Sequence, residues 1–481
     1  MHQLSRSVLL IWLCLLVPGA ATAQTTFGTI RGRALDPSGA PVPRATIVVT
    51  HNGTNIAKNT VTDSSGSYEV GYLLPGTYSV AAEAAGFKKF VAQDVVLYAQ
   101  ATILVDAQLA VGDITTSVTV DAGAPLITTE TAIISDVKTQ QQYLQAPMNT
   151  RSSGWDSFLY SFMSLVPGAQ PTTSYYTISF AGTRESQTNF TVDGITTNSV
   201  LFGNIVGPAN PSMEAIREVK VDLSGNSAEY GAPGYVTVIT KGGENQIHGS
   251  ASWYYNTGGL NARDFFASSK PFAVTNDFAV SVSGPVIKNK LFYAGTFEGF
   301  NWHTARVLNL SVPSVALRKG DFSALKDSRG APIVIRDPLT GAVFADGIIP
   351  TSRLNATALK SQDRFLPLPT YGDPQSISGN YRDLAKENLR KEQVDVRLDY
   401  QLSSANFLFG RLSIMRAPNG ALAGATPSMG YRIQRRQSRQ FVLSDTHTFR
   451  PNLTNEFRVG LIRGYNPRSG PFNGPDGRAH V

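Results

Sequence analysis

The chain has 481 residues, of which 16% are charged, 42% hydrophobic and 10% aromatic, with 43 glycines and 27 prolines. Few charges together with many aromatic residues and glycines favour a turn-rich β protein, and they exclude an intrinsically disordered chain and a helical bundle. The net charge of +7 comes from Lys and Arg residues scattered along the sequence, so no basic patch marks a nucleic-acid-binding protein.

Residues 1–23 have the features of a secretory signal peptide. Arg6 supplies a positive start, residues 8–17 an apolar core, and residues 21–23 an A-T-A cleavage site. We predict cleavage between Ala23 and Gln24. No later run reaches the ~18 apolar residues of a membrane helix, so this chain can span a membrane only as a closed β-barrel.

The residues beyond the signal give no sign of catalytic or metal chemistry. The one cysteine, Cys14, lies within the predicted signal peptide. The six histidines are far apart, and none stands in the H-E-x-x-H or H-x-x-E patterns that bind zinc. The sequence also has no G-x-S-x-G, G-x-G-x-x-G or P-loop motif. We therefore expect no enzyme activity, no metal and no cofactor.

Residues 27–110 are predicted to form a small β-sandwich, because turn clusters rich in Asp, Ser, Pro and Gly separate short alternating segments. The seven candidate strands are 29–35, 45–51, 56–62, 67–72, 77–82, 87–96 and 103–109. The segment resembles the carboxypeptidase regulatory-like domain through four motifs: G-x-x-x-D-P-S-G-x-P-V-x-x-A (32–45), T-D-S-S-G-S-Y (62–68), L-L-P-G-T-Y-S-V (73–80) and A-G-F (85–87). The resemblance implies a transthyretin-like fold, also grouped with carbohydrate-binding-like sandwiches, that serves as a folding or interaction module.

Residues 111–135 are predicted to be a connector. Within it, T-S-V-T-V-D-A (116–122) alternates as an extended segment and resembles the TonB box, through which the TonB protein pulls on outer-membrane receptors. That function needs a strand with a free edge to which a partner's sheet can add. The candidate contact residues are Thr116, Ser117, Val118, Thr119 and Val120. An ordinary linker or an extra edge strand of the sandwich is the alternative.

Residues 136–246 mix helices with strands. Apolar residues at i, i+3, i+4 and i+7 predict a helix from Trp155 to Phe162. Two shorter helices are expected at 137–144 and 212–217, and a tight turn at Asp193-Gly194. The predicted strands are 176–180, 189–192, 218–223 and 235–240.

This mixed segment resembles the plug domain of TonB-dependent receptors, which implies an α+β plug over residues 136–246. The motifs are A-G-T-R-E-S-Q-T-N-F-T-V-D-G-I (181–195), M-E-A-I-R-E-V-K-V (213–221) and S-A-E-Y-G-A-P-G-Y-V-T-V-I-T-K-G-G-E-N (227–245). One stretch, L-Q-A-P-M-N-T-R (144–151), departs from the usual L-P-L-N-G-R. A regulatory-like sandwich placed before a plug is similar to the Oar-like branch of this superfamily.

Residues 247–481 are predicted to form part of an outer-membrane β-barrel wall. The seven candidate strands are 249–258, 276–286, 290–301, 392–401, 404–416, 436–449 and 453–464. In V-D-V-R-L-D-Y (394–400) apolar residues alternate with charged ones, as a lipid-facing and a lumen-facing side require. Receptors of this class close about 22 strands. We therefore expect the sequence to be a fragment of a longer reading frame, with only the first strands of the barrel.

The connections between these strands alternate strictly in length. They are long at 259–275, 302–391 and 417–435, and short at 287–289, 402–403 and 450–452. Outer-membrane barrels have this rhythm, with short periplasmic turns and long extracellular loops. If the Gly-rich turn at 241–245 is periplasmic, every long connection lies outside the cell.

The predicted fold is therefore mainly β: a transthyretin-like sandwich, an α+β plug and the first strands of an antiparallel transmembrane β-barrel. The resemblance implies a receptor in the cell outer membrane, with the sandwich in the periplasm and the long loops extracellular. It further implies energy-coupled uptake of an unidentified ligand, with a TonB-type energy-coupling protein and outer-membrane lipid as partners. Iron chelates, vitamins, glycans and peptides all stay open as ligands. The alternative is a surface adhesion or carbohydrate-binding protein that the barrel anchors.

Overall fold

A computed structural model gives the fold. It describes residues 25–113, 117–121, 133–145, 163, 166–171, 178–180, 182–184, 187–198, 210–225, 232–263, 265, 270, 272–373, 375–450 and 453–470. The predicted signal cleavage at Ala23 and Gln24 and the predicted helix from Trp155 to Phe162 lie outside these residues.

The N-terminal unit is a β-sandwich with one apolar core between two sheets. Its strands are β1 (Gly28–Leu35), β2 (Thr46–His51), β3 (Ala57–Val61), β4 (Ser67–Leu73), β5 (Gly76–Glu83), β6 (Lys89–Leu97), β7 (Thr102–Leu104), β8 (Ala107–Gln108) and β9 (Ser117–Asp121). One sheet has the order β4-β1-β7, with β8 also on β1, and the other has the order β3-β2-β5-β6-β9. Ile47 and Val49 are fully buried between them, as the alternation of a strand requires.

The predicted strand 103–109 is interrupted, and this is a correction. β7 and β8 both run parallel to β1 in the same register, but they are separated at Val105 and Asp106. The Asp106 carboxylate accepts the Arg33 N–H at 2.8 Å, where a ladder carbonyl would otherwise accept it. The Asp106 side chain has therefore replaced a backbone carbonyl as the hydrogen-bond acceptor at this point between the two strands.

The second unit is built on a mixed sheet with the order β10-β15-β16-β13-β14, in which β13 runs parallel to β16. Its elements are β10 (Ile134–Thr139), α2 (Gln140–Gln145), β11 (Ala169–Pro171), β12 (Ile178–Phe180), β13 (Thr188–Val192), β14 (Ile195–Thr196), η3 (Met213–Ala215), β15 (Ile216–Ser224) and β16 (Gly234–Thr240). All seven residues of β16 are buried, because the strand is central in the sheet and covered on both faces. We refer to this unit as the plug.

Two helix predictions in the plug were wrong in extent. Residues 137–139 belong to β10, because they continue its antiparallel pairing with β15, and α2 begins only at Gln140. The helix expected at 212–217 is the single 3-10 turn η3, since Ile216 already pairs with Thr240 as the first residue of β15. At 212–217 pairing with a neighbouring strand overrides the local helical preference, whereas Val137 and Thr139 are β-branched and suit a strand by themselves.

The third unit is one long antiparallel sheet in chain order, which we call the wall. Its strands are β17 (His248–Thr257), β18 (Phe272–Ile287), β19 (Leu291–Leu310), β20 (Tyr381–Ser403), β21 (Asn406–Leu422), β22 (Tyr431–Arg450), β23 (Leu453–Tyr465) and β24 (Arg468–Ser469). All seven predicted strands are present, but most are longer than predicted. β19 and β20 stay paired from Leu291 opposite Tyr400 to Leu310 opposite Tyr381, so the longest connection shrinks to residues 311–380. It carries the short helices α4 (Val315–Arg318) and α5 (Ala356–Phe365).

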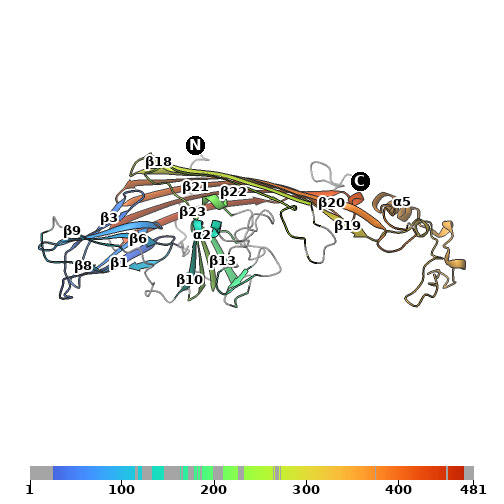
Figure 1. Ribbon diagram of the computed structural model, residues 1–481, viewed down its shortest axis with the longest axis horizontal. Helices are drawn as coiled ribbons and strands as arrows, with labels where there is room; N and C mark the ends of the chain where they lie inside the picture. The colour runs from blue at the N-terminus through green and yellow to red at the C-terminus, as the bar shows by residue number, and fades with distance from the viewer. Residues whose placement is uncertain are drawn as a thin grey trace, which may run out of the picture.

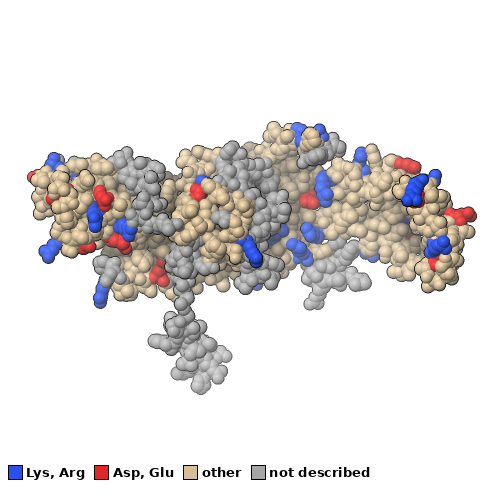
Figure 2. Space-filling view, turned by 90° about the horizontal axis from the view of Figure 1, so that it is seen from below, with Lys and Arg blue, Asp and Glu red and all other residues tan. Residues whose placement is uncertain are grey.

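The two faces of the wall differ as predicted. On β20, Val396 and Leu398 are 40% and 48% exposed, whereas Asp395 and Arg397 are 4% and 6% exposed. The apolar side chains point away from the plug and the charged ones point toward it. Figure 1 shows the wall along the top, the sandwich under one end and the plug under its middle, with α5 at the other end. Seen from below in Figure 2, charged residues form small scattered groups. None of the described helices is long and apolar enough to cross a membrane.

Candidate functional site

The predicted partner-binding segment forms the outermost strand of the larger sandwich sheet. β9 runs parallel to β6 in unbroken register over its five residues. Val118 and Val120 are 37% and 45% exposed. Of the predicted contact residues, Thr116 lies outside the described part of the chain, and the others, Ser117, Val118, Thr119 and Val120, lie in this strand. An edge strand of this kind is a template for pairing with another chain.

A buried ionic cluster joins the plug to the wall at Asp193, in the Asp-Gly turn between β13 and β14. Its carboxylate accepts the Thr240 N–H at 2.9 Å and the Thr240 hydroxyl at 2.8 Å. On the wall, Arg397 Nη1 lies 3.3 Å from Oδ1 and Arg411 Nε lies 2.7 Å from Oδ2. The side chains of all three ionic residues are at most 7% exposed. Because each charge is removed from water, each depends on its partners.

The charge state of Asp193 follows from these neighbours. Burial by itself would raise the pKa of this carboxyl. The guanidiniums of Arg411 and Arg397, with the two Thr240 donors, outweigh burial and hold the pKa below its usual range. Asp193 is therefore ionised at neutral pH, and the cluster carries opposite charges on the plug and the wall.

A second contact fixes η3 to the wall through carboxylates. Glu298 on β19 accepts the Met213 N–H at 3.1 Å and pairs with Lys391 Nζ at 2.6 Å. Asp395 on β20 accepts the Ser212 N–H at 3.0 Å. The first N–H groups of a helical turn have no partner within the turn, so wall carboxylates satisfy them here. The plug is thus held at two places by polar groups whose partners are across the interface.

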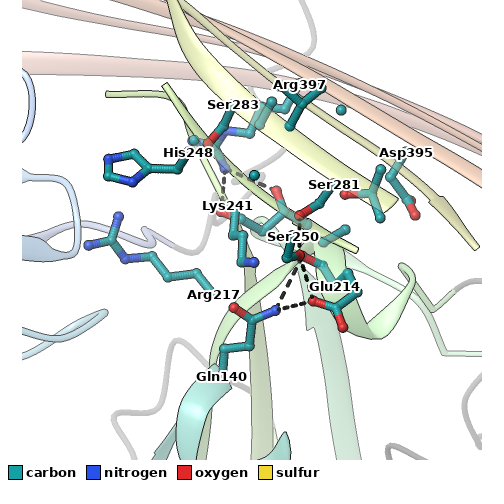
Figure 3. A pocket seen from close by; sticks show the side chains of 18 of the residues that line it. Gln140, Glu214, Arg217, Lys241, His248, Ser250, Ser281, Ser283, Asp395 and Arg397 are labelled. Carbon is teal, nitrogen blue, oxygen red and sulfur yellow. Dashed lines mark hydrogen bonds between the residues drawn. The ribbon is translucent and has the colours of Figure 1, made fainter. Parts of the chain in front are cut away.

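A polar cavity of about 610 Å³ lies between these contacts. Figure 3 shows side chains of the plug, among them Lys241 and Glu214, facing Ser250 and Ser281 of the wall. Glu214 accepts hydrogen bonds from Gln140 Nε2 at 3.1 Å and from Ser252 Oγ at 3.3 Å. Burial lowers the pKa of Lys241 and Arg217 lowers it further, while Glu214 opposes both. The lining combines charged and hydroxyl groups with apolar surface, to which Leu144, Tyr254 and Val282 contribute.

The sandwich is docked on the plug close to the same cavity. Glu218 on β15 accepts the Ala99 N–H of the sandwich at 2.7 Å. Asn245, in the Gly-rich turn after β16, donates its N–H to the Gly53 carbonyl at 2.8 Å. Burial raises the pKa of Glu218, and the Ala99 N–H partly offsets that rise. A displacement of the sandwich would therefore be transmitted to β15 and to the end of β16.

His51 makes this interface sensitive to pH. Its ring is 7% exposed, packs edge-on against Tyr78 at 5.0 Å and accepts the Thr54 N–H. Burial and then Arg217 lower the pKa of His51 from 6.5 to about 4. Between these values the unfolded chain binds a proton that the folded chain does not, so stability falls as pH falls. We expect a loss of roughly 3 kcal/mol between pH 7 and pH 4 from this group.

The test follows amide exchange over β2 and β5 in the full chain from pH 7 to pH 4, with His51→Asn as the comparison. The variant should lose most of the pH dependence of sandwich stability, whatever its stability at pH 7. If sandwich stability falls equally steeply with pH in both proteins, His51 is not the group that makes it sensitive to pH.

Sequence reasoning predicted the charged side of the wall, and it gave an extra edge strand of the sandwich, which β9 is, as the alternative to a TonB box. It did not join Asp193 to Arg397 and Arg411. Asp193 appeared only as a turn residue, and Arg397 only as a lumen-facing charge. The signal that could have found the cluster is the combination of an acidic turn at the end of a buried plug strand with a cationic row inside the wall. Among the described residues, no group of His, Cys, Asp or Glu is placed to hold a metal ion.

Comparisons with known proteins bear on both halves of the chain. Residues 239–480 match the family described as outer membrane beta barrel domain, and residues 29–110 match the carboxypeptidase regulatory-like domain. The TonB-dependent transporter Oar of Myxococcus xanthus is 28% identical over 389 residues, which cover 76% of this chain and 35% of that protein. The chain thus spans about a third of the length of this curated relative.

Solved outer-membrane proteins are also similar. The transporter YddB of Escherichia coli is 10% identical with a TM-score of 0.44, covering 70% of this chain and 40% of YddB. The siderophore receptor PirA of Pseudomonas aeruginosa is 15% identical with a TM-score of 0.39, covering 69% of this chain and 41% of PirA.

Proposed function

This chain belongs to the outer membrane beta barrel family, with an Oar-like arrangement of sandwich, plug and wall, and from that premise we propose that it works in energy-coupled uptake across the outer membrane. In this proposal a TonB-type protein binds β9 in the periplasm. Force on β9 reaches the plug, which moves relative to the wall and admits a ligand. The sandwich is periplasmic and the long connections are extracellular.

The observation that carries the proposal is the placement of β9. It is an exposed edge strand on a unit that is itself bonded to the plug through Glu218 and Asn245. A partner that adds a strand to β9 gains a row of backbone hydrogen bonds without needing a pocket. The plug, in turn, is held in the wall by the Asp193 cluster and lines a polar cavity. A pull on β9 therefore has a bonded path to the surface that must move.

Site-directed disulfide trapping tests the coupling step. Val118→Cys is introduced into the full chain, and the probe is the purified periplasmic domain of a TonB-type protein with one cysteine in its edge strand. We expect a mixed disulfide within minutes, because Val118 is exposed on the free-edge strand. A second substitution, Val120→Pro, should reduce the trapped fraction about tenfold, since proline removes a ladder donor.

The matched control is Val61→Cys. Val61 is 62% exposed on β3, the opposite edge strand of the same sheet, and should trap little of the probe. Equal trapping at Val61 and Val118 would indicate non-specific pairing and contradict the proposal. If neither position is trapped, the outcome favours the second function considered for this chain, a surface adhesin anchored by the barrel.

A further inference from the structure

The outer face of the wall carries an ordered apolar row across four neighbouring strands. Val396, Leu412, Phe441 and Leu461 stand opposite one another on β20 to β23 and are 40%, 44%, 46% and 67% exposed. On β23 the apolar outward positions run from Leu453 to Leu461, which is close to the 9–11 residues of a tilted membrane strand. On β22 and β23 the row therefore lies at one border of the hydrocarbon region, and on β20 and β21 the apolar face extends one outward position further, to Val394 and Ile414.

Arginines follow further along the same strands, and on β22 and β23 they occupy the next outward positions after Phe441 and Leu461. Arg439 stands directly opposite Arg463, and Arg416 lies one outward position further along β21, opposite Gln437. Arg390 and Arg435 stand beyond them on β20 and β22, and all five arginines are exposed. We call these five residues the arginine group. They are far apart in sequence, and only the strand register brings them together.

One carboxylate of the chain lies within the arginine group. Glu392 on β20 pairs with Arg390 and stands opposite Arg416 in the strand register, so one acidic residue faces five arginines. Within the described part of the chain, Arg416, Arg435, Arg439 and Arg463 form no ion pair. On the inner face, by contrast, Arg397 and Arg411 both reach Asp193. Arg439 and Arg463 are like charges directly opposite each other on neighbouring strands. Such a pair destabilises the sheet unless an anion lies between the two side chains.

The level of the group identifies the anion. On β22 and β23 the apolar row is one outward position from Arg439 and Arg463, so these two guanidiniums lie about 7 Å beyond the row, and Arg416, Arg390 and Arg435 lie further out. They lie on the side from which the long connections 311–380 and 423–430 leave. In outer-membrane barrels that side faces the outer leaflet. Guanidinium forks match phosphate oxygens in pairs, which an ammonium does not.

We propose that the arginine group binds the phosphates of an anionic glycolipid of the outer leaflet, of the lipid A type, while the apolar row packs against its acyl chains. One surface then supplies both parts that such a lipid needs. The bound lipid neutralises the Arg439–Arg463 pair and fixes the height of the wall in the membrane. The proposal rests on the outward face alone, so it stands or falls independently of the coupling through β9.

Native mass spectrometry of the full chain in mild detergent tests it, with lipid A, phosphatidylethanolamine and inorganic phosphate as separate probes. Lipid A should bind at least tenfold more tightly than phosphatidylethanolamine. Each arginine near an anionic lipid is worth about fivefold in affinity, so R416Q/R439Q/R463Q should bind lipid A roughly a hundredfold more weakly. The matched control is R33Q/R44Q/R329Q, which removes the same charge from exposed positions in the sandwich and in the connection 311–380, and it should bind within about twofold of the unaltered chain.

A second variant keeps the test decisive if the triple variant folds poorly. R439K/R463K keeps the charge but loses the fork, and should weaken lipid A binding about tenfold while leaving thermal stability unchanged. Equal binding of lipid A by the unaltered chain and either variant would overturn the proposal. Equal affinity for phosphatidylethanolamine would show that the apolar row alone binds lipid. Displacement of lipid A by an equal concentration of inorganic phosphate would show a site for free anions instead.

Discussion

Replacement of Asp193 by Asn is expected to destabilise the plug by about 3–5 kcal/mol, because it leaves guanidinium charge buried without its carboxylate. Arg411 loses the ion pair at 2.7 Å, and Arg397 keeps Asp399 at 2.9 Å as its carboxylate partner, together with its hydrogen bonds to Thr240. The loss is large because the Arg411 side chain is only 2% exposed, so water cannot replace the missing partner. Amide exchange at pH 7 measures this loss of stability: the amides of β13 and β16 should exchange faster in the variant.

Two comparisons make this result specific. The double variant Asp193→Asn/Arg411→Gln should lose less stability than the two single variants lose in sum, because each substitution removes the same interaction. The expected coupling free energy is about 1–3 kcal/mol. Asp363→Asn removes an ion pair with Arg318 in which the aspartate is 76% exposed, and should not change plug exchange. If Asp193→Asn leaves the exchange of β13 and β16 unaltered, the cluster does not hold the plug.

The cluster also shows what the sequence could not supply. The alternation over residues 394–400 predicts correctly that Asp395, Arg397 and Asp399 share one face of a strand. It cannot say what covers that face, because Asp193 is 204 residues away from Arg397. Local patterns report the period of a strand, whereas a partner across an interface depends on how separate units dock. The plug–wall contacts of Glu298 and Met213 were missed for the same reason.

The errors of the sequence prediction have a related origin. Residues 137–139 were predicted to begin a helix, although Val137 and Thr139 are β-branched, and their backbone groups are bonded to β15. The long connection was predicted from residue 302, because the polar residues beyond Phe300 show no clear alternation, yet β19 continues to Leu310. Strands that project beyond the membrane need no apolar face, so hydrophobicity does not mark their ends. The arginine group on β20 to β23 was likewise hidden, since its members are scattered in sequence.

Replacement of Gly243 by Val should prevent the turn after the plug from seating against the wall, at a cost of about 3 kcal/mol. A Cβ at Gly243 would lie 2.5 Å from the Tyr293 carbonyl oxygen and 2.7 Å from that of Gly284. Both atoms belong to the backbone of paired strands, so neither can move aside as a flexible side chain would. The φ of Gly243 is not in the left-handed region, so the requirement for glycine here is one of space.

The strands that are destabilised by Gly243→Val should show whether the turn controls how the plug is held. The turn joins β16, whose last residue Thr240 bonds Asp193, to β17, so a displaced turn pulls on the ionic cluster as well as on the sandwich contact at Asn245. We expect faster amide exchange in β16 and β13 with little change in β20 to β22. Gly295→Val is the matched control: it lies on β19, where an added Cβ meets no atom within 4 Å, and should exchange like the unaltered chain. Equal effects of the two substitutions would show that valine disturbs the wall itself, whereas an effect of Gly243→Val confined to β17 would show that the turn does not control how the plug is held.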